Sequence, residues 1–510
     1  MNPVSKLVTK NGRTYIEYLG NPYLFYGVQI RIDHLMLENI DDESKWEELF
    51  AKTKEMNFHS IIAQSWWRYI EKEKEQYDFY DIGLLIKWCE KYDLDLQLTW
   101  LGSNVCGEPF MTPWVGKKKY GELLSLPKDI MDDPVTYPRN ANAPEHSPDY
   151  SGENFINREK KVFKALLEYL EENDKNCRVS MIQVENEPDN VQGIEGLDWS
   201  DPAKIYPFLW SGGQADSSIA MMETLGKMVK ESGHKTVTRA NFIDVIYKNP
   251  YSREQHYLKK ILQGEGVDLV GIDNYSGRIE DSNELMDFIN EEAGGKPHIA
   301  HTPECCGSQG NTINMLMLAF SRGEGRLIYE IKTANFIPEE YNTSIYRQSS
   351  SEWIERDGTV DVYVYSGVAD YGFMKEGITG ELRDFNELVY KASCKLASLP
   401  IDSIAAFNIE NAEGPYEAVN TVCGRYHLSY FSPTGGEAMA MCDENGDLIL
   451  LSLYKDSAFK INGKTLSGEG STGYFTTDGK WIEQGTIDLS GSSVTLPGVT
   501  CMKISAESIL

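Results

Sequence analysis

The sequence predicts an α/β protein, a (β/α)8 TIM barrel followed by a C-terminal all-β, sandwich-like domain. Short apolar runs alternate with longer amphipathic ones from about residue 23 to about 335. After about residue 400 the pattern changes to short alternating strands separated by turns that contain Gly, Asn and Asp. The length of 510 residues is enough for a large core and two or more domains.

Eight apolar runs in the first part of the chain are expected to form strands. They cover 23–30, 58–64, 94–100, 179–185, 235–240, 267–273, 297–302 and 326–331. Helical patterns lie between them; in 158–173, Val162, Leu166 and Leu170 recur on one helical face. Eight strands alternating with helices favour a closed parallel barrel, although an open doubly wound sheet would show the same alternation.

Domain boundaries follow from composition. We expect the barrel over 1–340, a partly helical bridging segment over 341–400 and the all-β domain over 401–510. One connection, 101–155, is unusually long and dense in Pro, Gly, Asp and Asn. It follows the third strand, on the face where such barrels build their sites, and we interpret it as an active-site loop.

Charge and composition narrow the function classes. The formal net charge of −29 argues against nucleic acid or an anionic membrane as a partner, because both require basic patches. Neither a signal peptide nor a membrane-spanning apolar run is apparent, so we expect a cytoplasmic protein. The nine cysteines show no metal-binding spacing, which predicts reduced thiols, no metal and no cofactor. Homo-oligomerisation is left open.

Two carboxylates stand where predicted strands end. In "RVSMIQVENEPDN" (178–190) the fourth strand ends at Glu187, and in "HIAHTPECCGSQG" (298–310) the seventh ends at Glu304. Hydrolysis of a glycosidic bond requires two carboxyl groups, one to protonate the leaving oxygen and one to attack the anomeric carbon or activate water. Either Glu alone would be read as a solvated loop residue, but two at the carboxyl ends of barrel strands favour catalysis.

The motif "IQVENEP" (182–188) resembles the strand-four motif of glycoside hydrolase family 35, the β-galactosidases of a large clan of retaining barrel glycosidases. The segment from "MNFHSIIAQSWW" to "LQLTWLGS" (56–103) is similar to that family's run through strands two and three, and "LTWLGSN…TPWV" resembles its bacterial branch. The likeness covers about residues 20–335.

The resemblance implies a role for each matching residue. Glu187 would be the general acid/base and Glu304 the nucleophile, which requires the two carboxyl groups to lie about 5–5.5 Å apart. Asn186 would bind the 2-hydroxyl of the sugar. Tyr275, after the sixth strand, would donate a hydrogen bond to Glu304, with a core or rim tyrosine as the alternative. Glu185 alternates away from Glu187 and is expected to point into the helix layer.

Further residues are candidates for binding sugar at the rim. Trp67 and Trp100 could stack on pyranose faces, with barrel packing as the alternative for each. Polar candidates for sugar hydroxyls are Arg31, Asn104, Asn241 and Tyr329. Arg239 is placed at the rim as well, whereas His301 is interpreted as a core histidine with its hydrogen bonds satisfied rather than as a base.

Two departures from the family pattern keep the sugar open. Cys305 and Cys306 follow Glu304 in place of an aromatic residue and Gly, and "LIYEIKTANF" (327–336) replaces the family's Gly-Gly-Thr-Asn motif. From the two carboxylates and the resemblance together, we predict a retaining β-glycosidase that is β-galactosidase-like and exo-acting on oligosaccharides. The alternatives are a β-glycosidase or transglycosidase for glucose, mannose or arabinopyranose, and a non-catalytic carbohydrate-binding protein on a degenerate barrel.

Overall fold

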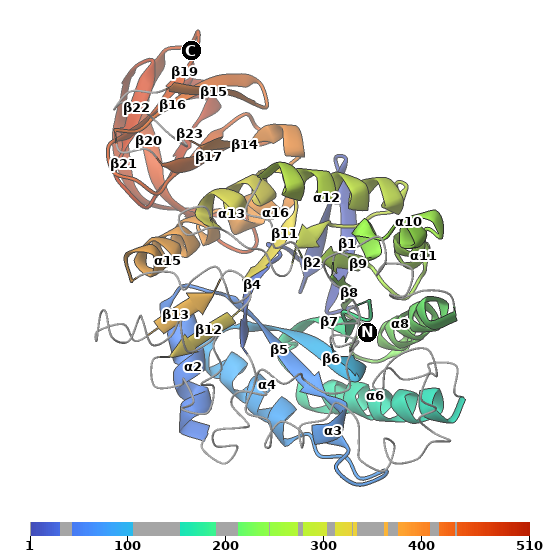
Figure 1. Cartoon of the computed structure of the whole chain (residues 1–510). Helices are drawn as coiled ribbons and strands as arrows, with labels where there is room; N and C mark the ends of the chain where they lie inside the picture. The colour runs from blue at the N-terminus through green and yellow to red at the C-terminus, as the bar shows by residue number, and fades with distance from the viewer. Residues whose placement is uncertain are drawn as a thin grey trace.

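The chain forms a barrel, a pair of bridging helices and a C-terminal β domain (Figure 1). The computed structural model describes residues 2–30, 43–105, 153–189, 213–243, 245–273, 279–302, 312–328, 330–333, 362–365, 376–408, 418–433 and 436–510. No helix in these ranges is both long and apolar enough to cross a membrane.

The barrel is closed and parallel, as predicted. Its strands are β4 (Tyr26–Ile30), β5 (Ser60–Trp66), β6 (Asp95–Val105), β7 (Val179–Asn186), β8 (Val237–Phe242), β9 (Leu269–Ile272), β10 (His301–Thr302) and β11 (Gly325–Ile328). β11 pairs with β4, and β10 pairs with both β9 and β11, which excludes the open doubly wound sheet. β6 continues to Val105, so the prediction that the connection begins at residue 101 is wrong by several residues.

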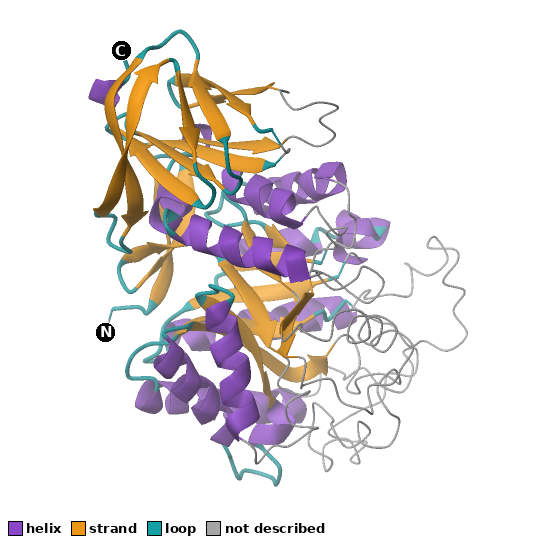
Figure 2. Cartoon of the chain, turned by 90° about the vertical axis from the view of Figure 1, so that its left-hand side faces the viewer, coloured by secondary structure: helices purple, strands orange, loops and turns teal. Residues whose placement is uncertain are grey.

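Helices surround the barrel on the outside (Figures 1 and 2). They are α2 (Glu43–Glu55), α3 (Trp67–Ile70), α4 (Tyr80–Tyr92), α6 (Glu153–Asn173), α8 (Gly213–Glu231), α9 (Val245–Lys248), α10 (Pro250–Glu254), α11 (Tyr257–Gln263), α12 (Ile279–Ala293) and α13 (Thr312–Ser321). In α6 the side chains of Val162, Leu166 and Leu170 are fully buried, which confirms the face predicted from their spacing.

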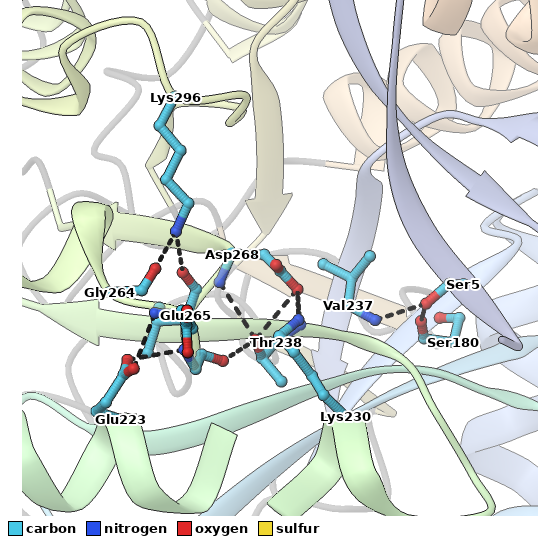
Figure 3. Close-up of polar contacts among 12 residues, drawn as sticks. Ser5, Ser180, Glu223, Lys230, Val237, Thr238, Gly264, Glu265, Asp268 and Lys296 are labelled. Atoms are coloured by element: carbon cyan, nitrogen blue, oxygen red, sulfur yellow. Dashed lines mark hydrogen bonds and ion pairs between the residues drawn. The ribbon is translucent and has the colours of Figure 1, made fainter. Parts of the chain in front are cut away.

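A three-stranded antiparallel sheet that the sequence analysis did not identify packs at the N-terminal face of the barrel. It comprises β1 (Ser5–Lys10), β2 (Arg13–Tyr18) and β3 (Asn21–Tyr23). Ser5 ties it to the barrel, because its hydroxyl donates to the carbonyl of Ser180 (2.5 Å) and accepts from the amide of Val237 (2.8 Å; Figure 3). The starts of β7 and β8 are thereby held together.

Side chains of α8 and of the segment before β9 form further contacts at the same face (Figure 3). The Asp268 carboxylate accepts from the Thr238 amide at 2.9 Å and pairs with Lys230 of α8 at 2.5 Å. Glu223 of α8 accepts from the Glu265 amide at 2.8 Å. These contacts satisfy backbone groups where strands begin, as expected of the face of a barrel that supports stability rather than chemistry.

Two helices join the barrel to the C-terminal domain. α15 (Glu376–Tyr390) and α16 (Ser393–Ser398) confirm the helical pattern predicted in the bridging segment. Leu382 and Phe385 of α15 belong to one buried apolar cluster that extends from the barrel helices to Met439 and Met441 of the C-terminal domain. Barrel and β domain therefore share a core through α15.

The C-terminal domain consists of two antiparallel sheets (Figure 2). Its strands are β14 (Ile404–Asn408), β15 (Ala418–Cys423), β16 (Tyr426–Phe431), β17 (Glu437–Cys442), β18 (Leu448–Ser452), β19 (Ser457–Ile461), β20 (Leu466–Phe475), β21 (Trp481–Gly491), β22 (Ser493–Leu496) and β23 (Thr500–Ile504). The six-stranded order β14-β17-β18-β23-β20-β21 and the four-stranded order β15-β16-β19-β22 enclose a second apolar core, which confirms the predicted sandwich. A further hairpin pairs β12 (Glu330–Thr333) with β13 (Val362–Tyr365).

The cysteines that the structure describes are all reduced. They are Cys89, Cys177, Cys394, Cys423, Cys442 and Cys501.

Candidate active site

The carboxyl end of β7 departs from regular strand geometry. Its pairing with β8 shifts register between Gln183 and Asn186, and both Glu185 (φ 68°) and Glu187 (φ 49°) have a left-handed backbone. Such conformations cost about 1–3 kcal/mol each for residues other than glycine and persist only where neighbours hold them. Here the amide of Glu187 donates to the carbonyl of Asn241 on β8 at 2.8 Å. The strained segment is thus held against the next strand.

This geometry brings three of the predicted site residues together. Glu187 is buried, with 5% of its surface exposed, and it directly follows β7 at the C-terminal rim. Asn186 Nδ2 donates to Glu187 Oε1 at 3.1 Å. Asn241 Nδ2 on β8 lies 3.3 Å from Asn186 Oδ1. The rim therefore holds a carboxylate oriented by an amide, which a second amide supports.

A chain of hydrogen bonds inside the barrel fixes the direction in which Asn186 donates. Arg239 has donors only, and its Nη2 binds Gln183 Oε1. The other end of the Gln183 amide, Nε2, must then donate, and it does so to Asn186 Oδ1 at 2.8 Å. With its oxygen accepting, Asn186 presents Nδ2 to Glu187. We call Arg239, Gln183 and Asn186 the amide relay.

Two buried carboxylates hold groups that lie next to the relay. Asp273, directly after β9 and 1% exposed, accepts from Asn241 Nδ2, with both carboxylate oxygens at 3.4 Å. Burial lowers the pKa of Arg239 to about 9, while Asp273 acts to raise it. Asp189 accepts from the amides of Ile243 (2.9 Å) and Ile246 (3.0 Å), which fixes the turn after β8 beside the site.

The sequence analysis missed Gln183, Asp189 and Asp273, and it placed Arg239 at the rim. Arg239 instead lies inside the barrel, 2% exposed. The sequence does indicate the inward position of Arg239, because Arg239 and Asn241 are two residues apart in a strand and their side chains therefore share one face. No comparable signal marked Asp189 or Asp273, since acidic residues after strands are common in solvated loops.

The two tryptophans occupy packed positions, which corrects the sugar-stacking expectation. Trp67 is fully buried against Phe155, with ring centroids 5.7 Å apart, and its indole donates to Glu71 at 2.7 Å. Trp100 is fully buried against Phe163 (5.2 Å) and donates to Glu159. Neither ring has a face open to a sugar, so the packing alternative describes both and we leave them out of the proposed site.

Several predicted residues lie outside the described part of the chain. These are Arg31, Tyr275, Glu304 and Tyr329. Asn104 lies in β6, but its side chain is also outside the description. Glu304 is two residues beyond Thr302, the end of β10.

Two further expectations are met. A methyl group on Gly102 would contact both Glu185 and Glu159 of α6, so the Glu185 carboxylate lies toward the helix layer, as predicted. His301 is fully buried beside Phe25, with ring centroids 4.8 Å apart, and burial together with Arg239 holds its pKa well below the usual value. It is a neutral core histidine, as expected from its position, but the expectation that its hydrogen bonds are satisfied is wrong: among the described residues neither ring nitrogen has a partner.

No cofactor or metal site emerges from the described residues. Within those ranges, no three His, Cys, Asp or Glu side chains gather in a way that could hold a metal ion. What the rim residues can do is acid–base and hydrogen-bonding chemistry: a buried carboxylate can exchange a proton, and the amides can orient hydroxyl groups.

Comparisons with known proteins match part of the chain to a family of unknown function and find several solved structures of low sequence identity. Residues 218–413, less than half of the chain, match a family described as a domain of unknown function, DUF4978. No curated protein sequence matches.

Among solved structures, one similar chain is a β-galactosidase from the psychrophilic Marinomonas ef1, with 12% identity, a TM-score of 0.45 and coverage of 74% of this chain. The chain spans 62% of that enzyme's length. A family 5 mannosidase from Rhizomucor miehei has 11% identity and a TM-score of 0.45, covering 75% of this chain and 97% of that one. A family 39 glycoside hydrolase from Bacteroides cellulosilyticus has 11% identity and a TM-score of 0.43, covering 98% and 87%. At identities of 11–12% and TM-scores of 0.43–0.45, these structures do not assign an activity to this chain.

Proposed function

We propose that the chain is a retaining β-glycosidase in which Glu187 is the general acid/base and Glu304 the nucleophile. The observation that supports this most is the position of Glu187: a buried carboxylate at the carboxyl end of a barrel strand, hydrogen-bonded by the preceding Asn186. Catalytic residues of such barrels lie at this rim. The sequence resemblance assigns the same pair, Asn then Glu, to acid/base catalysis.

In the proposed reaction, Glu187 protonates the oxygen of the leaving group while Glu304 attacks the anomeric carbon to form a glycosyl-enzyme. Glu187 then removes a proton from water, which attacks the same carbon and releases the sugar. Asn186 Nδ2 has two hydrogens, so one can bind Glu187 and the other the 2-hydroxyl of the sugar. Asn241 Oδ1, buried and without a donor among the described residues, could accept from a further hydroxyl.

For the substrate we propose a terminal β-galactoside of an oligosaccharide, cleaved from the non-reducing end. A neutral sugar is compatible with the net charge of −29. Glucose, mannose or arabinopyranose is the alternative glycone, and transglycosylation the alternative outcome, because the strand-eight motif of the resembled family is absent.

The first experiment is a panel of aryl β-glycosides of these four sugars, followed by peptide mass spectrometry after reaction with the matching 2-fluoro glycoside. We expect one glycone to be turned over and the label to appear on the peptide that contains Glu304. A label on any other peptide would refute the nucleophile assignment.

The second experiment tests Glu187. Glu187→Gln should abolish turnover of substrates with poor leaving groups, while dinitrophenyl glycosides, whose leaving group needs no proton, still glycosylate the enzyme. Glu185→Gln is the matched control, because it removes a neighbouring buried carboxylate that faces the helix layer. Equal loss in both variants would contradict the assignment.

A rival function is a carbohydrate-binding protein on a degenerate barrel. Calorimetry with the free sugars distinguishes the two. An enzyme loses turnover in Glu187→Gln and keeps sugar binding, whereas a binder shows sugar affinity with no turnover of any glycoside in the wild type.

A further inference from the structure

A cavity with a volume of about 430 Å³ lies at the N-terminal face of the barrel. Ser60 and Asp95, the first residues of β5 and β6, line it, as does Arg178, which directly precedes β7. Glu187 follows the other end of β7, so this cavity is at the face opposite the proposed active site. Its volume falls within the range of ordinary small-molecule sites, about 300–1,000 Å³.

Aromatic rings from separate parts of the chain form much of the lining. Tyr18 and Tyr23 of the N-terminal sheet meet edge to face, with centroids 5.3 Å apart. Tyr390 of α15 stacks on His59 at 3.8 Å. The Tyr18 hydroxyl donates to the carbonyl of Cys177 at 2.7 Å, which fixes its ring. The cavity is therefore pre-formed, with apolar surface held in place.

The lining also carries an excess of negative charge. Arg178 Nη1 pairs with Asp93 Oδ1 at 2.8 Å. Among the described residues, the ion pairs of the lining leave Asp95 with no cation of its own. Burial raises the pKa of Asp95 to about 7, although Arg178 acts to lower it. Burial lowers the pKa of His59 to about 4, so His59 is neutral at pH 7 and does not compensate.

We propose that this cavity binds a small organic cation, with an ammonium or guanidinium head at Asp95 and an apolar body against the tyrosine rings. A cation would neutralise the carboxylate that the fold buries, and aromatic faces attract cations electrostatically. Tyrosines beside carboxylates would also suit a neutral polyol. The Asp95 carboxyl, which no ion pair joins to a cation among the described residues, favours the cation.

The test is calorimetric titration of the full-length chain with matched pairs that share a body and differ in charge. The pairs are tyramine with tyrosol and glucosamine with glucose. We expect at least one cation to bind about tenfold or more tighter than its neutral partner, as a charge interaction of about 1.4 kcal/mol would give. Asp95→Asn should remove that preference.

Two further variants keep the result decisive. Asp81→Asn is the matched control, because burial raises the pKa of Asp81 to about 6 but the residue lies on α4, outside the cavity. Ser393→Trp fills the cavity from the start of α16 and should block binding even if Asp95→Asn fails to fold.

Each contrary outcome overturns the proposal. Equal binding of both members of every pair would mean that charge is not selected. Cation binding that survives both Asp95→Asn and Ser393→Trp would place the site elsewhere. No binding by any of the four compounds would leave the cavity a solvent-filled crevice. Tyramine and tyrosol carry no sugar, so the result for that pair is independent of the glycosidase proposed for the other face; binding of glucose or glucosamine counts for the cavity only where Ser393→Trp removes it.

Discussion

The amide relay makes a prediction that separates positioning from stability. Gln183→Glu keeps the shape of the side chain and gives Arg239 a carboxylate in place of an amide oxygen. The buried guanidinium therefore keeps its partner. On the side facing Asn186, however, the substitution replaces Gln183 Nε2, which donates to Asn186 Oδ1 at 2.8 Å, with a carboxylate oxygen that can only accept. Asn186 can avoid two facing oxygens by turning its amide, which directs Nδ2 away from Glu187.

The expected loss is that of one hydrogen bond to a charged group. Such bonds contribute about 1.5–3 kcal/mol. At about 1.4 kcal/mol per factor of ten, kcat/KM should fall by about 10- to 150-fold. The melting temperature should stay close to that of the wild type, because the charge pair gained with Arg239 offsets the lost hydrogen bond from Gln183 Nε2 to the Glu185 carbonyl (3.0 Å).

Gln97→Glu is the matched control. Gln97 Oε1 also accepts from Arg239, through Nη1 at 3.5 Å, so the substitution places the same charge beside the same guanidinium. The other end of this amide donates to the Ser60 hydroxyl at 3.0 Å, and that hydroxyl can rotate to become the donor. Gln97 is the strand partner of Met181, five residues before Asn186 on β7, so the kcat/KM of Gln97→Glu should remain that of the wild type.

The assay is kcat/KM on the aryl glycoside identified by the panel, measured with leaving groups of rising pKa. If Gln183 acts through Glu187, the loss should grow as the leaving group becomes poorer, which a purely structural defect would not produce. Equal losses in Gln183→Glu and Gln97→Glu, or wild-type activity in Gln183→Glu, would refute the relay.

Three other predictions follow from the described contacts. Gly102→Ala should lower the free energy of unfolding by about 1–3 kcal/mol in a urea titration, because its methyl group would overlap the buried Glu159 carboxylate. Ser5→Ala should cost about 1–3 kcal/mol in the same assay and leave kcat unchanged, because it deprives the buried Val237 amide of its acceptor far from the rim. Cation binding in the cavity at the N-terminal face should strengthen from about pH 6 to pH 8, because Asp95 loses its proton over this range. The Asp93–Arg178 pair stays charged there, and His59 and the lining tyrosines stay neutral. Calorimetry at both pH values checks the direction of the change.

The barrel was predictable because parallel strands are buried on both faces and therefore read as continuous apolar runs. Each of the eight predicted segments contains or overlaps one barrel strand. The N-terminal sheet was missed although its signal is present. Asn11 and Gly12 separate two alternating runs, and both have positive φ (52° and 77°), as a two-residue hairpin turn requires.

The site was predictable only in part. Glu187, Asn186 and Asn241 follow from the strand ends and the motif. The packing of Trp100 could also have been foreseen: it is an odd number of residues from the inward-facing Gln97, so the two side chains leave β6 on opposite faces. The amide relay could not be predicted, because Arg239, 56 residues away in the sequence, sets the orientation of the Gln183 amide, and no local sequence pattern encodes that contact.

The relay also offers a reason for an otherwise costly arrangement. Arg239 is fully buried, and two glutamine oxygens, from Gln97 and Gln183, stand where a carboxylate would give a stronger pair. Buried charges are often less stable than apolar residues of the same volume, so stability alone does not account for the guanidinium. A donor-only group at the base of the relay does account for it, because it leaves the Gln183 and Asn186 amides a single orientation each. In the proposed site, the relay would thus direct a hydrogen bond at Glu187 before a substrate binds.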